Sequence, residues 1–220
     1  MKYAAFYDID GTLVSCQTQQ LLAKVFFEER LLSFFEIAQI TLWFLIHKIG
    51  ISNDSNAIRK KVYRAFSLRS KGEIDQLIEK TFQQRIKPNL NYFLKQTIQN
   101  HKKEGAVIVA ISGTLEQFCE KVSSIFEIPE YFGTRLVVTD NRYRGGWQGV
   151  ILEKEAKVKL ARELALERGL DLRQSYVYAD SFGDLPLLQA VGHPIVVGND
   201  SKLIHYAKKQ GWQILRDNGT

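Results

Sequence analysis

The chain has 220 residues, 45% hydrophobic and 25% charged, a composition typical of a folded globular protein and not of a disordered one. Its 30 basic and 24 acidic residues give a formal net charge of +6, which favours anionic partners such as phosphorylated compounds or acidic membranes. The basic residues are scattered along the chain, which argues against a nucleic-acid stripe, so we expect no nucleic-acid partner.

The two cysteines, Cys16 and Cys119, are far apart and show no paired Cys/His spacing. This excludes a disulfide framework and gives no sign of a zinc site, so we expect two reduced thiols in a cytoplasmic protein. Asp8 also interrupts the first apolar run before a signal peptide could form.

The first element is a short buried strand over residues 4–7, followed by Asp8, Asp10 and Gly11. Carboxylates at i and i+2 leave a strand end on the same side, and Gly11 lets the backbone turn closely around whatever they hold. Asp and Gly are also ordinary turn residues, so this stretch by itself leaves the functional interpretation open.

A block of helices follows over residues 15–88, with apolar residues at helical spacing. Its segment 31–49 is strongly apolar but contains Glu36, Gln39, His47 and Lys48, and its uninterrupted core is too short to span a bilayer. We expect a packed helix there, with peripheral membrane contact through this helix as the alternative. Pro88 marks the expected end of the block.

From residue 89 onward strands alternate with helices. We expect strands at 107–111, 176–179, 195–197 and 212–215, helices at 90–103, 115–126 and 153–168, and a β-hairpin over 135–147. The triplet Ser112-Gly113-Thr114 is expected to end the strand before it. This alternation predicts an α/β fold, a Rossmann-like doubly wound parallel sheet, with domains at 1–14 and 89–220 (core) and at 15–88 (helical insertion).

Ligands of such sheets bind outside the carboxyl ends of the strands, where Asp8, Ser112 and Asp180 are expected. With Asp10, Asp184 and a lysine near the start of the 153–168 helix, they form a set of carboxylates, a hydroxyl and a cation. Carboxylates suit Mg²⁺, a hydroxyl beside a helix N-terminus suits a phosphate, and lysine stabilises charge that develops during phosphoryl transfer. The set therefore predicts phosphoryl-transfer chemistry.

With this set of residues the sequence resembles the haloacid dehalogenase superfamily of phosphatases. The resemblance rests on four motifs in order: DIDGT at 8–12, AISGT around Ser112, KEAK at 154–157 and ADSFGD at 179–184. Residues 175–188 and 191–197 look closest to the phosphoserine-phosphatase-like branch, subfamily IB. The resemblance implies that the inserted helical block is an all-helical cap of the C1 type.

The resemblance also implies a role for each motif residue. Asp8 would be the nucleophile that forms an aspartyl-phosphate, and Asp10 the general acid and base, with its carbonyl on Mg²⁺. Ser112 and the Gly113 amide would bind the phosphoryl group together with Lys157. Asp8, Asp10, Asp180 and Asp184 would form the metal site, where Asp184 supports the metal shell or orients the lysine. Lys154 and Lys159 remain rivals of Lys157, which is favoured by its register with Glu155.

The predicted function is that of a Mg²⁺-dependent phosphomonoester hydrolase acting on a small phosphorylated metabolite such as phosphoserine. The apolar segment 31–49 would suit a lipid phosphate of the phosphatidylglycerophosphate type, so this substrate stays open. A phosphotransferase and a non-enzymatic binding protein on the same scaffold are further alternatives. The physiological substrate and the oligomeric state are not predicted.

Overall fold

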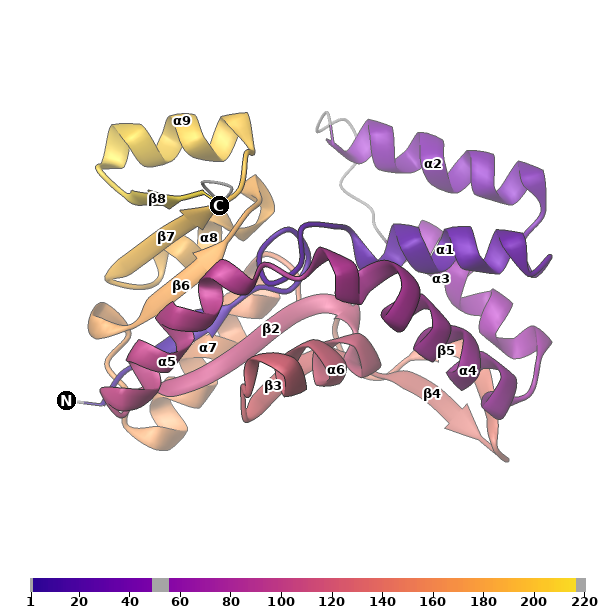
Figure 1. The fold of residues 1–220 in the computed structure, drawn as a ribbon, viewed down its shortest axis with the longest axis horizontal. Coiled ribbons are helices and arrows are strands. Elements are labelled where there is room, and N and C mark those ends of the chain that lie inside the picture. The colour runs from indigo at the N-terminus through magenta and orange to yellow at the C-terminus, as the bar shows by residue number, and fades with distance from the viewer. Residues whose placement is uncertain (1, 49–55, 217–220) are drawn as a thin grey trace. The chain divides into compact units, whose positions relative to one another are not determined.

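A computed structural model describes residues 2–48 and 56–216 (Figure 1). The chain divides into two compact units. The sheet unit contains residues 1–17, 87–134 and 150–220, and the helical unit contains residues 18–86 and 135–149. The predicted helix stop at Gly50 and turn at 52–54 lie outside the described residues, as does Ile49 at the end of the apolar segment.

The sheet unit is built on six parallel strands in the order β3-β2-β1-β6-β7-β8. These strands are β1 (Ala4–Tyr7), β2 (Val107–Leu115), β3 (Glu130–Thr134), β6 (Tyr176–Ala179), β7 (His193–Val197) and β8 (Gln213–Leu215). The chain adds strands first on one side of β1 and then on the other, so the doubly wound parallel sheet is confirmed, and its switch point lies at the carboxyl end of β1.

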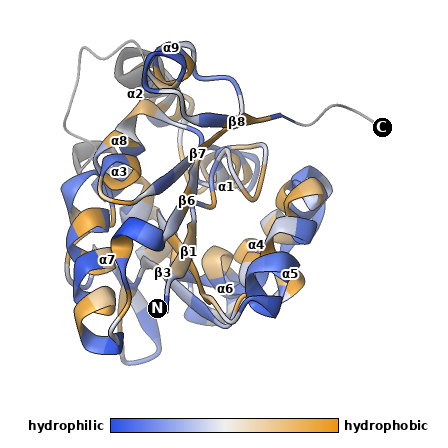
Figure 2. Cartoon of the chain, turned by 90° about the vertical axis from the view of Figure 1, so that its left-hand side faces the viewer, coloured by the Kyte–Doolittle hydropathy of each residue, from blue (hydrophilic) through white to orange (hydrophobic). Residues whose placement is uncertain are grey.

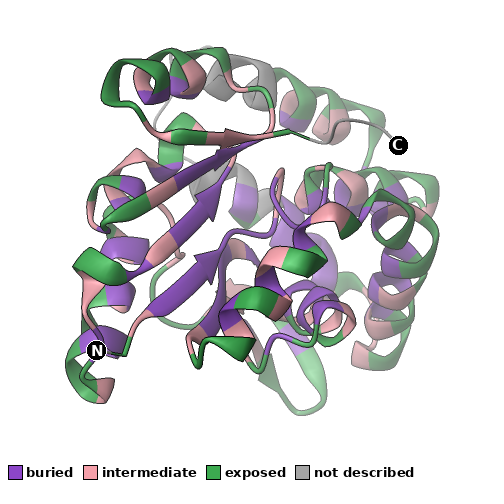
Figure 3. Ribbon diagram, turned by 60° about the vertical axis from the view of Figure 1, so that its left-hand side comes forward, coloured by how far each residue is buried: buried purple, intermediate pink, exposed green. Residues whose placement is uncertain are grey.

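The central strands are buried because helices cover them, as the purple strands of Figure 3 show. All four residues of β1 are buried, and β6 and β7 contribute Val177, Ala179 and Val196 to the core. Near-continuous apolar strands of this kind are expected when both faces of a parallel sheet are covered.

The helices of this unit follow the apolar periodicity. They are α5 (Lys95–Lys103), α6 (Glu116–Phe126), α7 (Glu155–Arg168), α8 (Leu185–Gln189) and α9 (Ser201–Gln210), with single turns at η3 (Lys87–Asn89), η4 (Tyr92–Leu94), η5 (Leu172–Gln174) and η6 (Phe182–Asp184). Helix α7 shows both hydrophobic and hydrophilic stretches (Figure 2) and buries Val158, Ala161 and Leu164. It ends at Gly169, whose φ of 64° is left-handed, a common helix stop.

One prediction for the sheet fails, and one strand was not predicted. Ser112-Gly113-Thr114 does not end β2, which continues to Leu115 because the strand keeps pairing with β3 after a register shift between Ile111 and Leu115. Strand β3 itself was not predicted, because four of its five residues are only half-buried at the edge of the sheet and show no clear alternation.

The helical unit contains α1 (Thr18–Glu28), α2 (Phe34–Lys48), α3 (Asn56–Ala65), η1 (Phe66–Leu68), α4 (Lys71–Thr81) and the π-helical η2 (Phe82–Ile86). It also contains the hairpin of β4 (Leu136–Thr139) and β5 (Arg142–Trp147), which was predicted in the range of the core domain. Buried Tyr143 accounts for this difference, because its hydroxyl donates to Asp75 Oδ1 at 2.5 Å and its ring packs edge-on against Phe66.

Helix α2 carries the apolar segment noted in the sequence. Ile40 is buried, whereas the side chains of Phe34 and Phe35 are 77% and 70% exposed. The side chains of residues 43–48 lie outside the described residues. Among the described helices, none combines the length and the apolar character needed to cross a membrane.

Candidate active site

The site is built around Asp8, which follows β1 at the switch point of the sheet. The backbone N–H of Asp8 donates to the carbonyl of Tyr178 on β6 at 3.0 Å, so the residue is still tied to the neighbouring strand. Strand β2 pairs with β1 on its other side, with Tyr7 opposite Ala110. Asp180 directly follows β6, as the sequence predicted, whereas Ser112 lies within β2, two residues beyond Ala110.

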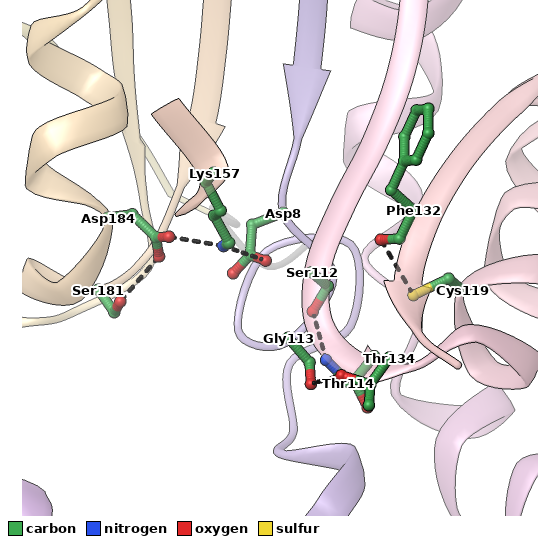
Figure 4. A network of polar contacts seen from close by, with 10 residues as sticks. All are labelled: Asp8, Ser112, Gly113, Thr114, Cys119, Phe132, Thr134, Lys157, Ser181 and Asp184. Atoms are coloured by element: carbon green, nitrogen blue, oxygen red, sulfur yellow. Dashed lines mark hydrogen bonds and ion pairs between the residues drawn. The ribbon is translucent and has the colours of Figure 1, made fainter. Parts of the chain in front are cut away.

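Lys157, from the first turn of α7, joins two of the predicted carboxylates (Figure 4). Its Nζ donates to Asp8 Oδ1 at 2.8 Å and to Asp184 Oδ1 at 2.6 Å. Lys157, Asp8 and Asp184 are only 4%, 7% and 5% exposed. Buried charges persist in proteins when they are paired and hydrogen-bonded, so this triad is a specific arrangement and not a surface ion pair.

The structure separates Lys157 from its two rivals. Lys154 is exposed and lies just before α7, at a positive φ of 47°. Lys159 is exposed on the outer side of the helix, and its Nζ lies 3.8 Å from Glu163. Lys157 is buried, and its Nζ is hydrogen-bonded to Asp8 and Asp184.

Asp180 follows β6 and packs against the turn that carries Gly11. A Cβ at Gly11 would lie 1.9 Å from Asp180 Oδ2, and the φ of Gly11 is +79°. Glycine is therefore required here both by backbone conformation and by the space that the carboxylate occupies. The turn residue of DIDGT thus makes room for the carboxylate of the fourth motif.

Asp8, Asp180 and Asp184 form a group whose carboxylate oxygens, one from each residue, lie within 4.8 Å of one another. The donors are all oxygens, which is the ligand type that Mg²⁺ prefers, and this ion commonly binds through one or two carboxylates plus substrate phosphate. Lys157 offsets only part of their negative charge. The donor set therefore fits a hard divalent cation.

The pKa values follow from this crowding. Burial raises the pKa of Asp8 to about 7, with Lys157 acting in the opposite direction and Asp184 adding to the rise. Burial, with Asp8 and Asp184 nearby, also raises the pKa of Asp180 well above its ordinary value. Burial would lower the pKa of Lys157, but the carboxylates of Asp184 and Asp8 outweigh it and raise that pKa. A bound cation would favour the ionised carboxylates.

Ser112 and Gly113 lie on the continued part of β2. The Ser112 hydroxyl is buried and accepts a hydrogen bond from the Thr114 backbone N–H at 3.2 Å, while the Gly113 carbonyl accepts from Thr134 Oγ1 at 2.8 Å. In Figure 4, Ser112 lies on the side of Asp8 away from Asp184. The segment is therefore fixed next to the nucleophile candidate by its own hydrogen bonds.

Asp10 is half-buried in the turn after β1, where it forms a bridge with Val14. Its carboxylate is not among the clustered oxygens of Asp8, Asp180 and Asp184. Its charge nevertheless contributes to the raised pKa of Asp8. Asp10 thus lies beside the carboxylate cluster without belonging to it.

Ser181, within the motif ADSFGD, supports Asp184. Its Oγ donates to Asp184 Oδ2 at 2.8 Å, so both oxygens of Asp184 are fixed, one by Ser181 and one by Lys157. The i, i+3 spacing of Ser181 and Asp184 was visible in ADSFGD, but the same spacing is common in helix caps.

Comparison with known proteins gives a family. A family model described as "haloacid dehalogenase-like hydrolase" matches residues 5–189, which include all four motifs. The chain is 29% identical over 220 residues to a histidinol-phosphatase of Neisseria meningitidis, covering 98% of this chain and 99% of the relative. It is also 29% identical over 216 residues to a phosphoserine phosphatase of Mycobacterium tuberculosis, covering 96% and 70% of the two chains.

A solved structure supports the fold. The phospho-aspartyl intermediate analogue of a phosphoserine phosphatase superposes with a TM-score of 0.74 at 21% identity, covering 97% of this chain and 92% of the other. At this identity the likeness shows a shared fold alone. The parallel sheet flanked by helices is therefore common to both chains.

Proposed function

The chain belongs to the haloacid dehalogenase-like hydrolase family, and from this membership we propose that it is a magnesium-dependent phosphatase with Asp8 as its nucleophile. The observation that carries the proposal is the buried triad in which Lys157 bridges Asp8 and Asp184. A structural ion pair would need one carboxylate. Here one lysine binds two carboxylates, and the carboxylate of Asp180 lies near them. This arrangement suits a site that binds a cation and a phosphate.

The proposed reaction has two steps. A carboxylate oxygen of Asp8 bonds to phosphorus while the ester P–O bond breaks, and the leaving alkoxide takes a proton from Asp10. Water then loses a proton to Asp10 and attacks phosphorus, which releases inorganic phosphate and restores Asp8. Ser112 and the Gly113 amide hydrogen-bond the phosphoryl oxygens, and Lys157 stabilises the negative charge that develops on them.

Magnesium, when bound, would supply a positive charge that neutralises the phosphate and favours ionised Asp8. Asp8, Asp180 and the Asp10 carbonyl would hold it, and Asp184 would support the site through Lys157. Because the pKa of Asp8 is raised to about 7, a nearby positive charge would be needed to keep its carboxylate fully ionised, and so nucleophilic, at neutral pH.

For the substrate we propose a small phosphorylated metabolite, with phosphoserine as the first candidate. The relative that matches over nearly its whole length is named for histidinol phosphate instead. Both compounds are phosphate esters of a 2-amino alcohol, and their amino-bearing carbon carries a carboxylate in phosphoserine and an imidazolylmethyl group in histidinol phosphate. This shared ester is the substrate class that we propose.

The test is phosphate release from phosphoserine, histidinol phosphate, a sugar phosphate, a nucleotide and a lipid phosphate in detergent, with and without Mg²⁺. We expect metal-dependent release that Asp8→Asn lowers by at least about 10³-fold, because the nucleophile is lost. Asp140→Asn is the matched control, since this carboxylate is exposed in the hairpin. Activity that survives Asp8→Asn would contradict the mechanism.

The lipid phosphate is kept as a second candidate because Phe34 and Phe35 are exposed on α2. Preference for the lipid phosphate over both amino-alcohol phosphates would favour it. Turnover that depends on an added alcohol acceptor would instead identify a phosphotransferase. Wild-type protein that releases no phosphate from any compound would favour a binding protein on this scaffold.

A further inference from the structure

Of the four chain connections between the sheet unit and the helical unit, the two on either side of residues 18–86 have paired segments in the sheet unit. The outgoing segment contains Val14 and Ser15, and the returning segment contains residues 89–91. Val14 and Leu90 form an antiparallel bridge, and the Ser15 backbone N–H donates to the Asn89 carbonyl at 2.8 Å. All these residues belong to the sheet unit, so the pairing lies within one unit.

Asn91 extends this pairing into the turn that follows Asp8. Its side-chain Nδ2 donates to the Thr12 carbonyl at 2.6 Å, and its backbone N–H donates to the Leu13 carbonyl at 2.9 Å. One residue of the returning segment thus binds two successive carbonyl groups of the turn. The asparagine carboxamide is needed for the first bond, whereas any residue except proline could make the second.

The same two peptide groups are bound at their other ends by the nucleophile segment. The Leu13 N–H donates to the Asp8 carbonyl at 3.3 Å, and the Val14 N–H donates to the Ile9 carbonyl at 3.0 Å. Because a peptide group is planar, fixing its carbonyl also fixes the direction of its N–H. Asn91 therefore orients the two N–H groups that hold the backbone of Asp8 and Ile9.

We propose that Asn91 is a positioning residue that sets the backbone of the nucleophile turn from the segment returning out of the helical unit. This inference rests on the proposed function, because it assigns Asn91 an effect on the step that Asp8 performs. Asn91 acts through the Thr12–Val14 peptides and touches none of the acidic side chains in the described hydrogen bonds. Displacing the returning segment would shift Asp8 through this side chain.

The chain offers a matched set of variants. Asn91→Leu removes the donor at similar volume, and Asn91→Asp keeps the shape but turns a carboxylate oxygen toward the Thr12 carbonyl. Asn100→Leu is the control for the same substitution, because Asn100 is exposed on α5 and its carboxamide oxygen accepts only a bond from Gln96 in the described residues. Ser15→Ala removes the Ser15 hydroxyl bond to the Asn89 carbonyl and leaves the backbone bond.

We expect Asn91→Leu and Asn91→Asp to lower kcat about 10-fold or more while KM changes less than about threefold, since a shifted nucleophile affects the transition state more than substrate binding. Inhibition by vanadate, which mimics the trigonal-bipyramidal phosphorus of the transition state, should weaken in parallel with kcat, whereas inhibition by inorganic phosphate should not. Both control variants should keep wild-type kcat.

A purely structural role gives a different result. If both Asn91 variants lower the melting temperature but keep wild-type kcat and vanadate inhibition, the proposal is overturned. The proposal is also overturned if Ser15→Ala lowers kcat as much as Asn91→Leu does, because the pairing of the segments would then suffice. An inactive wild-type protein would instead remove the proposed function, so the two failures are distinguishable.

Discussion

The two units of the chain differ in net charge and in where their buried carboxylates lie. The sheet unit contains 16 basic and 16 acidic residues and is formally neutral, whereas the helical unit contains 14 basic and 8 acidic residues and carries the whole net charge of +6. The buried carboxylates among the described residues, Asp8 and Asp184, both lie in the neutral unit with buried Lys157.

This difference teaches that net charge and chemistry are separate properties here. The positive excess suggested anionic partners, but the groups suited to phosphate chemistry belong to the unit without excess charge. There, charges of both signs are buried at hydrogen-bonding distance, where each is worth more than an exposed one. In the helical unit, ion pairs such as Lys80–Glu29 and Arg85–Glu28 are partly exposed and contribute little individually.

The comparison is tested most strongly at Lys157. We expect Lys157→Met to lower kcat/KM by about 10²-fold to 10³-fold, because it removes a cation aimed at developing phosphoryl charge and leaves two buried carboxylates without it. Lys154→Met and Lys159→Met are the matched controls, since both lysines are exposed. A control that loses as much activity as Lys157→Met would restore the corresponding rival as the catalytic lysine.

The next test concerns Gly11. We expect Gly11→Ala to weaken Mg²⁺ binding about 10-fold to 100-fold, because its Cβ would displace the Asp180 carboxylate. Gly105→Ala is a close control: φ is +78° against +79° at Gly11, but nothing lies within 4 Å of its Cβ. It should cost about 1 kcal/mol of stability without changing metal affinity. Titrating the activity of each variant with Mg²⁺ measures its metal affinity. Equal affinities for Gly11→Ala and Gly105→Ala would contradict the close packing of Gly11 against Asp180.

A smaller effect is expected from pH. Because the pKa of Asp8 is raised from 3.8 to about 7 by folding, its contribution stabilises the metal-free protein below about pH 4 and is lost as pH rises through 7. Mg²⁺ competes with the proton for the same oxygens, so its stabilisation should grow from pH 5 to pH 8. Melting temperatures with and without Mg²⁺ measure this, and Asp8→Asn should weaken the trend. An equal Mg²⁺ shift at both pH values would rule out this coupling.

The smallest effect is expected in the helical unit. Ser70 caps α4 in a capping box, accepting from the Glu73 N–H at 3.3 Å while Glu73 accepts from the Ser70 N–H at 3.0 Å. Ser70→Ala should lower the free energy of unfolding by about 1 kcal/mol and leave kcat unchanged. Denaturant unfolding and steady-state kinetics check both, and a large fall in kcat would show that this helix takes part in the chemistry.

The sequence by itself determined the elements whose signal is local. The buried strands, the helical periodicity of α7 and the Asp-rich strand ends could all be identified from neighbouring residues, and they were enough to predict the parallel sheet. The order of the four motifs indicated the family. It also indicated the site, because parallel strands bring their carboxyl ends to one edge of the sheet whatever lies between them.

Only the tertiary structure decided the features that depend on distant residues. The register of α7 turns Lys157 inward and leaves Lys154 and Lys159 exposed, which three lysines within six residues could not reveal. The hairpin joins the helical unit through Tyr143 and Asp75, 68 residues apart. Strand β3 continues the pairing of β2 at the edge of the sheet. In each case the feature is stabilised by a contact between segments far apart in the chain, and local sequence patterns do not indicate such contacts.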